Sequence, residues 1–402
     1  MKYPVLGFEP FFTWGCRSKI MYKPGAREEL DFEMEKLGGT KAFLYTDKGL
    51  VQAGVAEMVI DTIKASSLEL AGVYDKIVQD ARIDLINEGA ALYRECGADC
   101  MVSVGGGSVM DTAKAINILI GKGLEDFSPL ADQVGLFDDA EPLPPHIAFP
   151  TTAGTGAEVS YGMVVLGDAT QGKITCAHPY CSPDLAMLDP ELTVKLPPEI
   201  TAFTAMDAMT HAIEAITTGS ANPISDGLGL HAIRLIMTYL PEVMKNPENI
   251  EARGYLLIAS SMAGISMANA LLGAVHSTAH ALGALYGIPH GLANSIMLPH
   301  VMTFNLEENP TRFVFIADAM GVKIDGMTPE QAAGAAVQAL KDLQRSVGLT
   351  KTLKDFGVPE SREALQPLID LAMGDAQTPY NPRYLEEDDV YDLYLKARQG
   401  NA

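Results

Sequence analysis

Residues 101–108 of the chain are Met-Val-Ser-Val-Gly-Gly-Gly-Ser, and a helical pattern begins at Val109. The first four residues predict a buried strand, and the glycines predict a tight turn from that strand into the helix. Glycines let the backbone approach a pyrophosphate closely, and a helix N-terminus offers unpaired N–H donors with a favourable dipole. The candidate phosphate-binding residues are Gly105, Gly106, Gly107 and Ser108. Taken alone, the pattern is better explained by a tight turn that binds nothing.

The same alternation of strand and helix runs through the first half of the chain. This rhythm predicts βαβ units and a mostly parallel, Rossmann-like sheet with its ligand at the carboxyl ends of the strands. The predicted strands are Ala42–Thr46, Leu70–Tyr74, Met101–Val104 and Ile147–Pro150, and the predicted helices are Val51–Ser66, Ile83–Cys96 and Val109–Ile120. The acidic, proline-rich residues from Asp126 to Pro145 predict a long surface loop.

The strand signals end after Leu196-Pro197-Pro198, and helical patterns follow. The predicted helices, some of them broken, are Thr201–Thr217, Ser225–Met244, Ile250–Ala281, Thr328–Val347 and Ser361–Met373. At 402 residues the chain exceeds the size at which a single core stops growing. We therefore expect an α/β dinucleotide-binding domain over residues 1–196 and an all-helical domain over residues 197–402.

Two further groups follow predicted strands and strengthen the nucleotide-binding interpretation. Residues 151–156, Thr-Thr-Ala-Gly-Thr-Gly, come directly after the predicted strand that ends at Pro150. Their hydroxyl and N–H groups suit phosphate and ribose oxygens, which makes Thr151 and Thr152 candidates. Asp47 follows another predicted strand, where a carboxylate accepts from a ribose hydroxyl and selects NAD over NADP. A turn or helix-cap role explains Asp47 equally well.

Residues 254–306 contain no Asp, Glu, Lys or Arg, yet they hold four of the eight histidines. His276 and His280 are four residues apart, as are Asp207 and His211, so each pair faces one side of a helix. His290 follows a Gly-Ile-Pro break that turns it back toward them. A single such histidine is more often a hydrogen-bonded core residue than a ligand. As a set with one carboxylate, these residues suit Fe(II), Zn or a neighbouring divalent metal.

The composition of the chain limits the classes of partner and the cellular compartment that we expect for the protein. The formal net charge of −22 argues against nucleic acid or an anionic membrane as a partner. The uncharged stretch is long enough to span a bilayer, but its Ser, Gly, Asn269 and histidines favour a buried helix pair. We expect no signal peptide, and five cysteines without a C-x-x-C motif fit reduced thiols in the cytoplasm.

Over nearly its whole length the chain resembles the iron-containing (group III) alcohol dehydrogenases. Four motifs carry the resemblance: Gly105-Gly-Gly-Ser-x-x-Asp111-Thr-Ala-Lys114, Thr151-Thr-Ala-Gly-Thr-Gly-Ala-Glu158, Met206-Asp-Ala-Met-Thr-His-Ala-Ile-Glu214, and His276-Ser-Thr-Ala-His280 with Pro289-His-Gly291. The resemblance implies a dehydroquinate synthase-like fold, in which the active-site cleft lies between the two domains. It also implies a homodimer or larger homo-oligomer.

The family's functional residues transfer motif by motif. The resemblance implies Asp207, His211, His276 and His290 as metal ligands and places His280 beside the nicotinamide, where we expect it to relay a proton or position the ring. It places Gly106, Gly107 and Ser108 on the pyrophosphate, Thr151 and Thr152 near the nicotinamide ribose and phosphate, Asp47 at the adenosine ribose, and Lys173 on the cofactor side. Asp111 and Lys114 match a pair that flanks the cofactor, but an i, i+3 ion pair fixing the helix is an equally good interpretation.

These assignments predict a metal- and NAD-dependent alcohol dehydrogenase that interconverts a small, primary alcohol and its aldehyde by direct hydride transfer. Fe(II) is the expected metal, with Zn as the alternative. The rival functions are a metal-dependent hydrolase or lyase, a polyol dehydrogenase acting on glycerol-like substrates, and a non-catalytic dinucleotide sensor. Ala157, Tyr161-Gly162-Met163 and Leu271 depart from the family pattern near the expected substrate pocket, so the substrate does not transfer with the fold.

Overall fold

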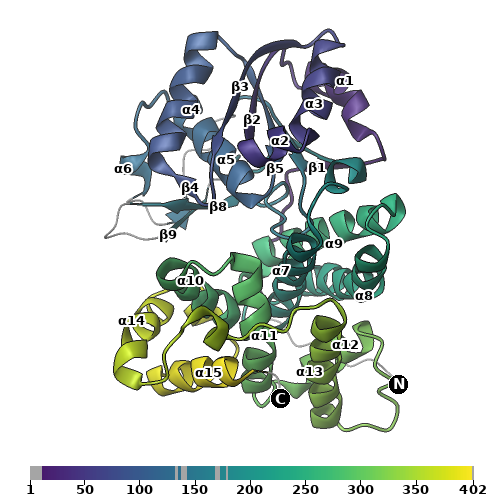
Figure 1. Ribbon diagram of the computed structural model, residues 1–402, viewed down its shortest axis with the longest axis vertical. Coiled ribbons are helices and arrows are strands. Elements are labelled where there is room, and N and C mark those ends of the chain that lie inside the picture. The colour runs from purple at the N-terminus through teal and green to yellow at the C-terminus, as the bar shows by residue number, and fades with distance from the viewer. Residues whose placement is uncertain (1–10, 132–134, 137–142, 168–172, 178–179, 401–402) are drawn as a thin grey trace. The chain divides into compact units, whose positions relative to one another are not determined.

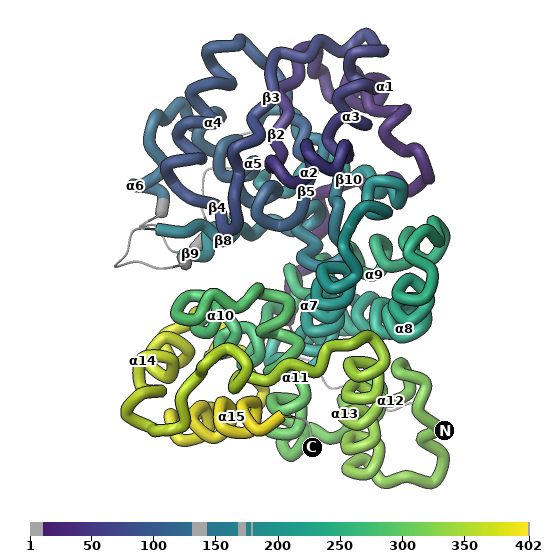
Figure 2. Tube along the Cα trace, in the orientation of Figure 1, coloured from purple at the N-terminus to yellow at the C-terminus, as the bar shows by residue number. Residues whose placement is uncertain are grey.

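A computed structural model describes residues 11–131, 135–136, 143–167, 173–177 and 180–400 (Figures 1 and 2). The chain divides into two compact units at Leu196 and Pro197. Residues 16–196 form the α/β unit, and the described residues after Leu196 form the helical unit together with residues 11–15. The Gly15 N–H donates to Asn269 Oδ1 (2.8 Å), and Asn269 Nδ2 donates to the Gly15 carbonyl (2.9 Å). These two bonds tie the N-terminal segment to the helical unit.

A six-stranded, wholly parallel sheet forms the centre of the α/β unit, with the strand order β1-β10-β7-β5-β2-β3. The strands are β1 (Lys19–Tyr22), β2 (Lys41–Asp47), β3 (Glu69–Ile77), β5 (Cys100–Gly105), β7 (His146–Pro150) and β10 (Leu185–Leu188). The parallel sheet and the four predicted strands are confirmed. The sequence analysis missed β1 and β10, because four residues are too few to show a hydrophobic period.

Helices cover both faces of this sheet (Figure 1). One face packs against α4 (Ile83–Cys96) and α5 (Gly107–Gly121), and the other against α1 (Leu30–Lys36) and α3 (Val55–Lys64). The predicted helix over residues 51–66 is wrong at its start. The chain there forms α2 (Lys48–Gln52) and then α3, because Gly54 between them has φ +72°, which ends one helix before the next begins.

The strand order brings the candidate cofactor residues to one edge of the sheet. From β2 the chain crosses outward to β3 and then returns to β5 on the other side of β2. Ligands of parallel α/β sheets bind outside the carboxyl ends of the strands at such a reversal point. The neighbouring strands β2, β5 and β7 end at Asp47, Gly105 and Pro150. The three predicted turns therefore lie side by side.

A second, four-stranded sheet has the order β4-β8-β9-β6, in which only β8 and β9 are antiparallel. Its strands are β4 (Ala81–Arg82), β6 (Gly135–Leu136), β8 (Gly162–Leu166) and β9 (Lys173–Ala177). This sheet was not predicted. The loop predicted from Asp126 to Pro145 contains α6 (Ser128–Ala131) and β6, while residues 132–134 and 137–142 lie outside the described residues.

The helical unit confirms the predicted all-α region. Its helices are α7 (Pro198–Thr217), α8 (Pro223–Lys245), α9 (Ile250–Ala270), α10 (Ala274–Tyr286), α11 (His290–Asn305), α12 (Pro310–Ala319), α13 (Pro329–Ser346), α14 (Arg362–Met373) and α15 (Glu387–Gln399). The sequence analysis missed α11, α12 and α15. Two of the missed helices carry an internal or initial proline, which weakens the periodic signal.

The helix predicted over residues 250–281 is two helices, α9 and α10, bent by 105°. In the described part of the chain no single helix is long and apolar enough to cross a membrane, and only this bent pair passes such a test. The bend lies at Leu271, whose φ of +65° belongs to the region that favours glycine. Such a conformation costs on the order of 1–3 kcal/mol in a residue with a side chain. The strained turn directly precedes the helix that carries His276.

Candidate active site

Three polar side chains lie along one face of α7. Asp207, His211 and Glu214 are spaced by four and three residues on a stretch that is buried from Ala205 to Thr217. Burying ionisable groups in an apolar core costs free energy unless each group finds a partner. The sequence places these groups inside the core, so their partners must come from other helices.

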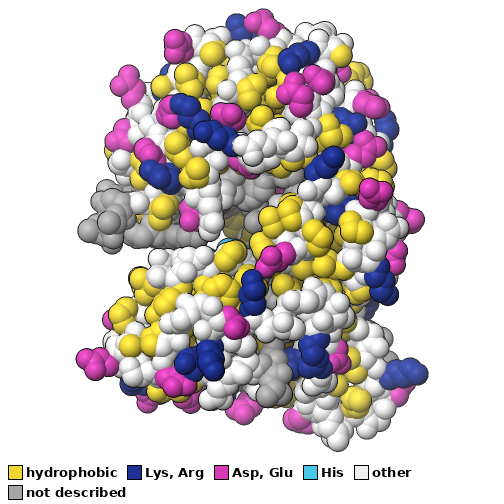
Figure 3. Space-filling view, in the orientation of Figure 1, with side chains coloured by type: hydrophobic (Ala, Val, Ile, Leu, Met, Phe, Trp, Pro, Cys, Tyr) yellow, Lys and Arg dark blue, Asp and Glu magenta, His cyan; other side chains and the backbone are white. Residues whose placement is uncertain are grey.

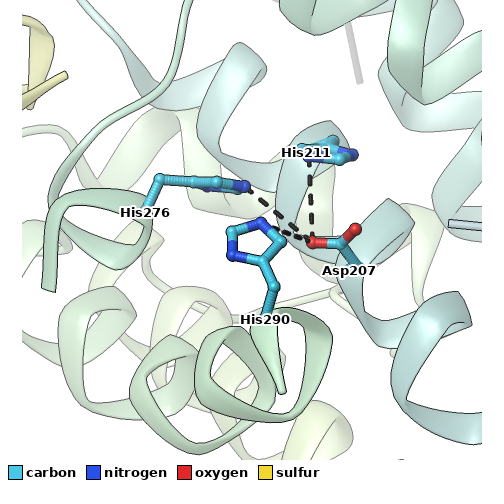
Figure 4. A group of neighbouring side chains, drawn as sticks. All are labelled: Asp207, His211, His276 and His290. Carbon is cyan, nitrogen blue, oxygen red and sulfur yellow. Dashed lines mark ion pairs between the residues drawn. The ribbon is translucent and has the colours of Figure 1, made fainter. Parts of the chain in front are cut away.

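Four candidate metal ligands converge on this face, as Figure 4 shows. Asp207 Oδ1 lies 3.5 Å from His290 Nε2, 3.8 Å from His211 Nε2 and 3.9 Å from His276 Nε2. One ligand atom from each residue lies within 4.8 Å of all the others. The side chains of Asp207, His211 and His276 are 2–5% exposed, whereas His290 is 31% exposed. Three of the four side chains are therefore buried, and His290 is the one through which solvent reaches the cluster.

The donor set fits a divalent cation. Burial alone would raise the pKa of Asp207, but the neighbouring His211, His290 and His276 outweigh it, and the pKa falls below its usual value. Burial lowers the pKa of His276 well below its usual value, so this imidazole is neutral, as a metal ligand must be. No Lys or Arg among the described residues pairs with Asp207. A metal ion held by these side chains would supply the fixed positive charge that a buried carboxylate requires.

The spacing of the ligand atoms supports the same conclusion. Tetrahedral ligands at about 2.1 Å from a metal lie about 3.4 Å apart, close to the observed 3.5–3.9 Å from Asp207 Oδ1. Oxygen and nitrogen donors without thiolate are ligands that Fe(II) and Zn both accept. His211 Nδ1 is buried without a hydrogen-bond partner. The structure thus brings together all four residues that the sequence analysis predicted to bind metal.

Glu214 orients one of these candidate ligands, a role that the sequence analysis did not assign. Its Oε2 is hydrogen-bonded to His276 Nδ1, and its Oε1 accepts from the Val275 N–H at 2.8 Å. Burial raises the pKa of Glu214 to about 7. A carboxylate on the far nitrogen fixes the tautomer and orientation of a ligating histidine. The available signal was an acidic residue three positions after His211 in an apolar helix.

We expect Glu214→Gln to weaken metal binding by about tenfold to 100-fold, the usual effect of losing such an orienting partner. Glutamine keeps the size of the side chain but removes the anionic acceptor. Titration of the metal-free protein with Zn²⁺ measures the change in Kd. The matched control is Glu363→Gln, an exposed residue on α14 that makes no hydrogen bond or ion pair with the described residues. An unchanged Kd in Glu214→Gln would contradict the orienting role.

Asn294 is a second residue that the sequence analysis missed. Its Nδ2 lies 2.6 Å from Asp207 Oδ1 and 3.1 Å from the Nε2 atoms of both His276 and His290. An amide has two N–H groups, so it cannot satisfy three acceptors at once. Its Oδ1 is buried without a partner. The cluster is therefore rich in acceptors, which is what a cation requires.

His280 lies beside the cluster rather than in it. Its Nδ1 is 2.8 Å from Asp375 Oδ2, and its ring stacks on His290 with centroids 5.3 Å apart. Burial would raise the pKa of Asp375, but His280 outweighs that effect, and the pKa falls below its usual value. The side chain of His280 is 16% exposed. It is therefore held by a carboxylate on one nitrogen, which leaves the other for a proton.

The glycine turn and the threonine turn pack against each other at the edge of the sheet. Gly106 precedes α5 with φ −88°, so its backbone conformation does not require glycine. Close packing, however, leaves little room for a side chain at Gly106 and too little at Gly107. A Cβ on Gly106 would lie 3.2 Å from Thr152 Oγ1, and a Cβ on Gly107 would lie 2.7 Å from Thr155 Cγ2. No side chain caps the start of α5, so its first N–H groups face outward for an anion. The two predicted turns therefore pack closely against each other beside the uncapped N-terminus of α5.

The remaining side chains of the cradle are fixed by local bonds. Ser108 Oγ accepts from the Asp80 N–H at 3.1 Å. Thr151 is buried, and its N–H donates to the Gly105 carbonyl at 3.0 Å, while Thr152 is half-buried. Asp47 Oδ1 accepts from the Leu50 N–H at 2.9 Å and caps α2. The helix-cap alternative for Asp47 is thus present in the structure, and it occupies only one of the two carboxylate oxygens.

Asp111 and Lys114 form the ion pair that was one of their two interpretations. Asp111 Oδ1 and Lys114 Nζ are 3.7 Å apart. Asp111 Oδ2 accepts from the Val164 N–H (3.0 Å), and Lys114 Nζ donates to the Gly162 carbonyl (2.9 Å). The pair thereby attaches α5 to β8. Lys173 begins β9, and its side chain lies outside the described residues.

Comparison with known proteins agrees with this geometry. Residues 17–190 match the family described as "Iron-containing alcohol dehydrogenase", and residues 201–398 match "Fe-containing alcohol dehydrogenase family, C-terminal". Lactaldehyde reductase of Escherichia coli K12 is 38% identical over 373 residues, or 93% of this chain and 96% of that protein. NAD-dependent methanol dehydrogenase of Bacillus methanolicus is 35% identical over the same shares. The crystal structure of a 1,3-propanediol oxidoreductase has a TM-score of 0.91 and 34% identity, and the match covers 96% of this chain and 99% of that one. The chain belongs to the iron-containing alcohol dehydrogenase family.

Proposed function

We propose that this protein interconverts a small, primary alcohol and its aldehyde by hydride transfer to and from NAD. The family and the NAD-dependent relatives support an NAD-dependent, metal-containing alcohol dehydrogenase, and the size and class of the alcohol are the proposed part. The relatives named above act on lactaldehyde, methanol and 1,3-propanediol, all of them small. The observation that carries the proposal is the buried cluster of one carboxylate and three imidazoles.

When bound, the metal supplies a Lewis acid for the alcohol oxygen, and NAD supplies the hydride acceptor. Asp207, His211, His276 and His290 would hold the metal. The apolar, buried surroundings of α7 keep water away, which strengthens electrostatic interactions with the reacting oxygen. The accessible side beside His290 is where we place the substrate.

For the cofactor, we propose that Gly106, Gly107 and Ser108 hold the pyrophosphate, with Thr151 and Thr152 at the nicotinamide ribose and phosphate. Asp47 accepts from the adenosine ribose through the oxygen that does not cap α2, and it disfavours a 2′-phosphate. We also propose that Lys173 contacts the cofactor. The active-site cleft between the two domains likewise remains a proposal. Asp111 and Lys114 act on the cofactor indirectly, because they hold α5 in place.

The test is metal content together with NADH formation on a series of linear alcohols and glycerol, before and after chelation. We expect bound metal, NADH formation with short primary alcohols, loss of activity on chelation and recovery with Fe²⁺ or Zn²⁺. NADP is expected to react much more slowly than NAD. Bound metal without redox activity on any alcohol or aldehyde would favour a hydrolase or lyase, which the oxidoreductase relatives do not support. A preference for glycerol would favour the polyol alternative.

We propose that His280 relays a proton or positions the nicotinamide. His280→Ala should lower kcat by about 10²-fold, the lower end of what a positioned acid or base contributes, and should flatten the pH profile. Metal content should not change, because His280 is not among the four clustered ligands. His231→Ala, at an exposed position on α8, is the control. Normal turnover with an unchanged pH profile would eliminate the proposed role.

We also propose a homodimer or larger homo-oligomer in the cytoplasm. β1 lies at one end of the sheet and pairs with β10. Its residues Ile20 and Tyr22 are 41% and 40% exposed. An edge strand with exposed apolar residues is a surface that a second chain can cover. All five cysteines are unpaired, which suits a reducing compartment. Light scattering on the purified protein would give the mass of the assembly, and a monomer would contradict this proposal.

A further inference from the structure

A cavity of about 140 Å³ lies within the helical unit and does not include the candidate metal ligands. Its walls come from α11, α13, the segment 349–352 and the end of α15. Several cavity residues lie on α11, the helix that also begins with His290 and carries Asn294. The cavity and the metal cluster therefore use different residues of one helix.

The polar lining of this cavity is positively charged. Lys341, Arg345 and Lys351 line it together with His300, and no Asp or Glu stands among its described lining residues. This is unusual for a chain with a net charge of −22, on which the face in Figure 3 shows acidic and basic side chains interspersed. Hydroxyl groups of Ser295, Thr350 and Thr352 complete the lining, and the hydroxyl of Thr352 donates to Asp355 Oδ2 at 3.0 Å. The described lining thus carries cations and neutral polar groups but no carboxylate of its own.

Two of the nitrogen-bearing side chains of the lining lack a hydrogen-bond or ion-pair partner among the described residues. Lys341 and His300 are half-buried and form no hydrogen bond or ion pair with the residues the structure describes. Burial chiefly, and then the charges of Lys341 and Lys396, lower the pKa of His300 to about 4. An ammonium and an imidazole that lack a partner among the described residues keep their N–H groups available. An anion in the cavity would accept hydrogen bonds from them.

The other two cations can turn toward the cavity at little cost. Arg345 pairs with Asp342, and Lys351 pairs with Glu199 at 3.1 Å. All four of these side chains are more than half exposed, at 51–64%. Exposed ion pairs of this kind contribute about 0–1 kcal/mol, so a bound anion can compete for the cationic ends.

We propose that this cavity is a binding site for a phosphate group, either free or carried by a small ester. Several cations with hydroxyl donors match an anion that carries about two charges and three or more acceptor oxygens. Lysine acts on such a group as a point charge, and arginine as a fork of donors. A bound phosphate would contact α11 through its residues 295–300 and would stabilise the helix that presents His290. This inference does not rest on the proposed function.

The test is calorimetric titration with inorganic phosphate and, separately, with glycerol 3-phosphate. The protein is used loaded with metal and NAD, so that neither the metal nor the cradle competes. We expect saturable binding of one phosphate group per chain. Lys341→Gln and Arg345→Gln should each raise the Kd at least about tenfold, because each removes a charge-assisted hydrogen bond. Tighter binding of the ester would identify an organic phosphate as the ligand, and tighter binding of inorganic phosphate would identify the free anion.

Lys323→Gln is the matched control, because Lys323 is an exposed lysine of the same unit that does not line the cavity. It should leave the Kd unchanged. Lys341→Gln should also melt no lower than the wild type in phosphate-free buffer, since the unpaired ammonium stabilises nothing there. Absence of saturable binding, or an equal Kd in Lys341→Gln, Lys323→Gln and the wild type, would overturn the assignment.

Discussion

Asp207→Asn is expected to abolish metal binding and to lower kcat/KM with NAD and a short alcohol by at least about 10³-fold. Among the four clustered side chains that we propose as ligands, Asp207 is the one anion, and all three imidazole nitrogens lie 3.5–3.9 Å from its Oδ1. Asparagine keeps the shape but removes the charge that compensates the cation. A loss of about 10³-fold corresponds to about 4 kcal/mol, within the several kcal/mol that a Lewis acid contributes. Metal analysis of the purified variant and NADH formation measure the two effects.

The control for this variant is Asp318→Asn, which removes a carboxylate that is 37% exposed and pairs with Arg234. It should retain metal and activity. Circular dichroism should show Asp207→Asn folded, since removing a buried charge relieves a desolvation cost when no metal is bound. A folded Asp207→Asn protein that still holds one tightly bound metal would show that the cluster is not the metal centre.

The parts of the fold that the sequence predicted well are those with strong local signals. The predicted helix Ile83–Cys96 coincides with α4 at both ends, because its hydrophobic period is regular and Gly97, with φ +63°, terminates it. β5 was also predicted from a local signal, because its apolar run ends in three consecutive glycines. By contrast, β1 and β10 are defined by pairing with each other over a separation of more than a hundred residues, which no local pattern reveals.

The residue types of the candidate metal site were predictable from the sequence, but the contacts that distinguish one histidine from another were not. Histidines in an uncharged stretch are informative because buried imidazoles need a partner. Spacing could not separate His276 from His280, since both lie on one face of α10. The structure separates them, because His276 points to Asp207 while His280 is held by Asp375, 95 residues away. Glu214 and Asn294 act across 62 and 87 residues, so only the packing of helices reveals them.

Gly107→Val is expected to raise the Kd for NAD by about 10³-fold, or about 4 kcal/mol, without changing the metal content. A Cβ at this position would already lie 2.7 Å from Thr155 Cγ2, and Thr155 is β-branched and cannot easily turn away. Valine would therefore separate the two turns and cover the first N–H groups of α5. NADH fluorescence titration measures the affinity. Gly334→Val, on α13 where no atom outside the local helix backbone lies within 4 Å of the added Cβ, controls for placing a β-branched side chain in a helix. If Gly107→Val bound NADH as tightly as Gly334→Val does, the pyrophosphate would have to lie elsewhere, because the N-terminus of α5 cannot hold an anion through a valine side chain.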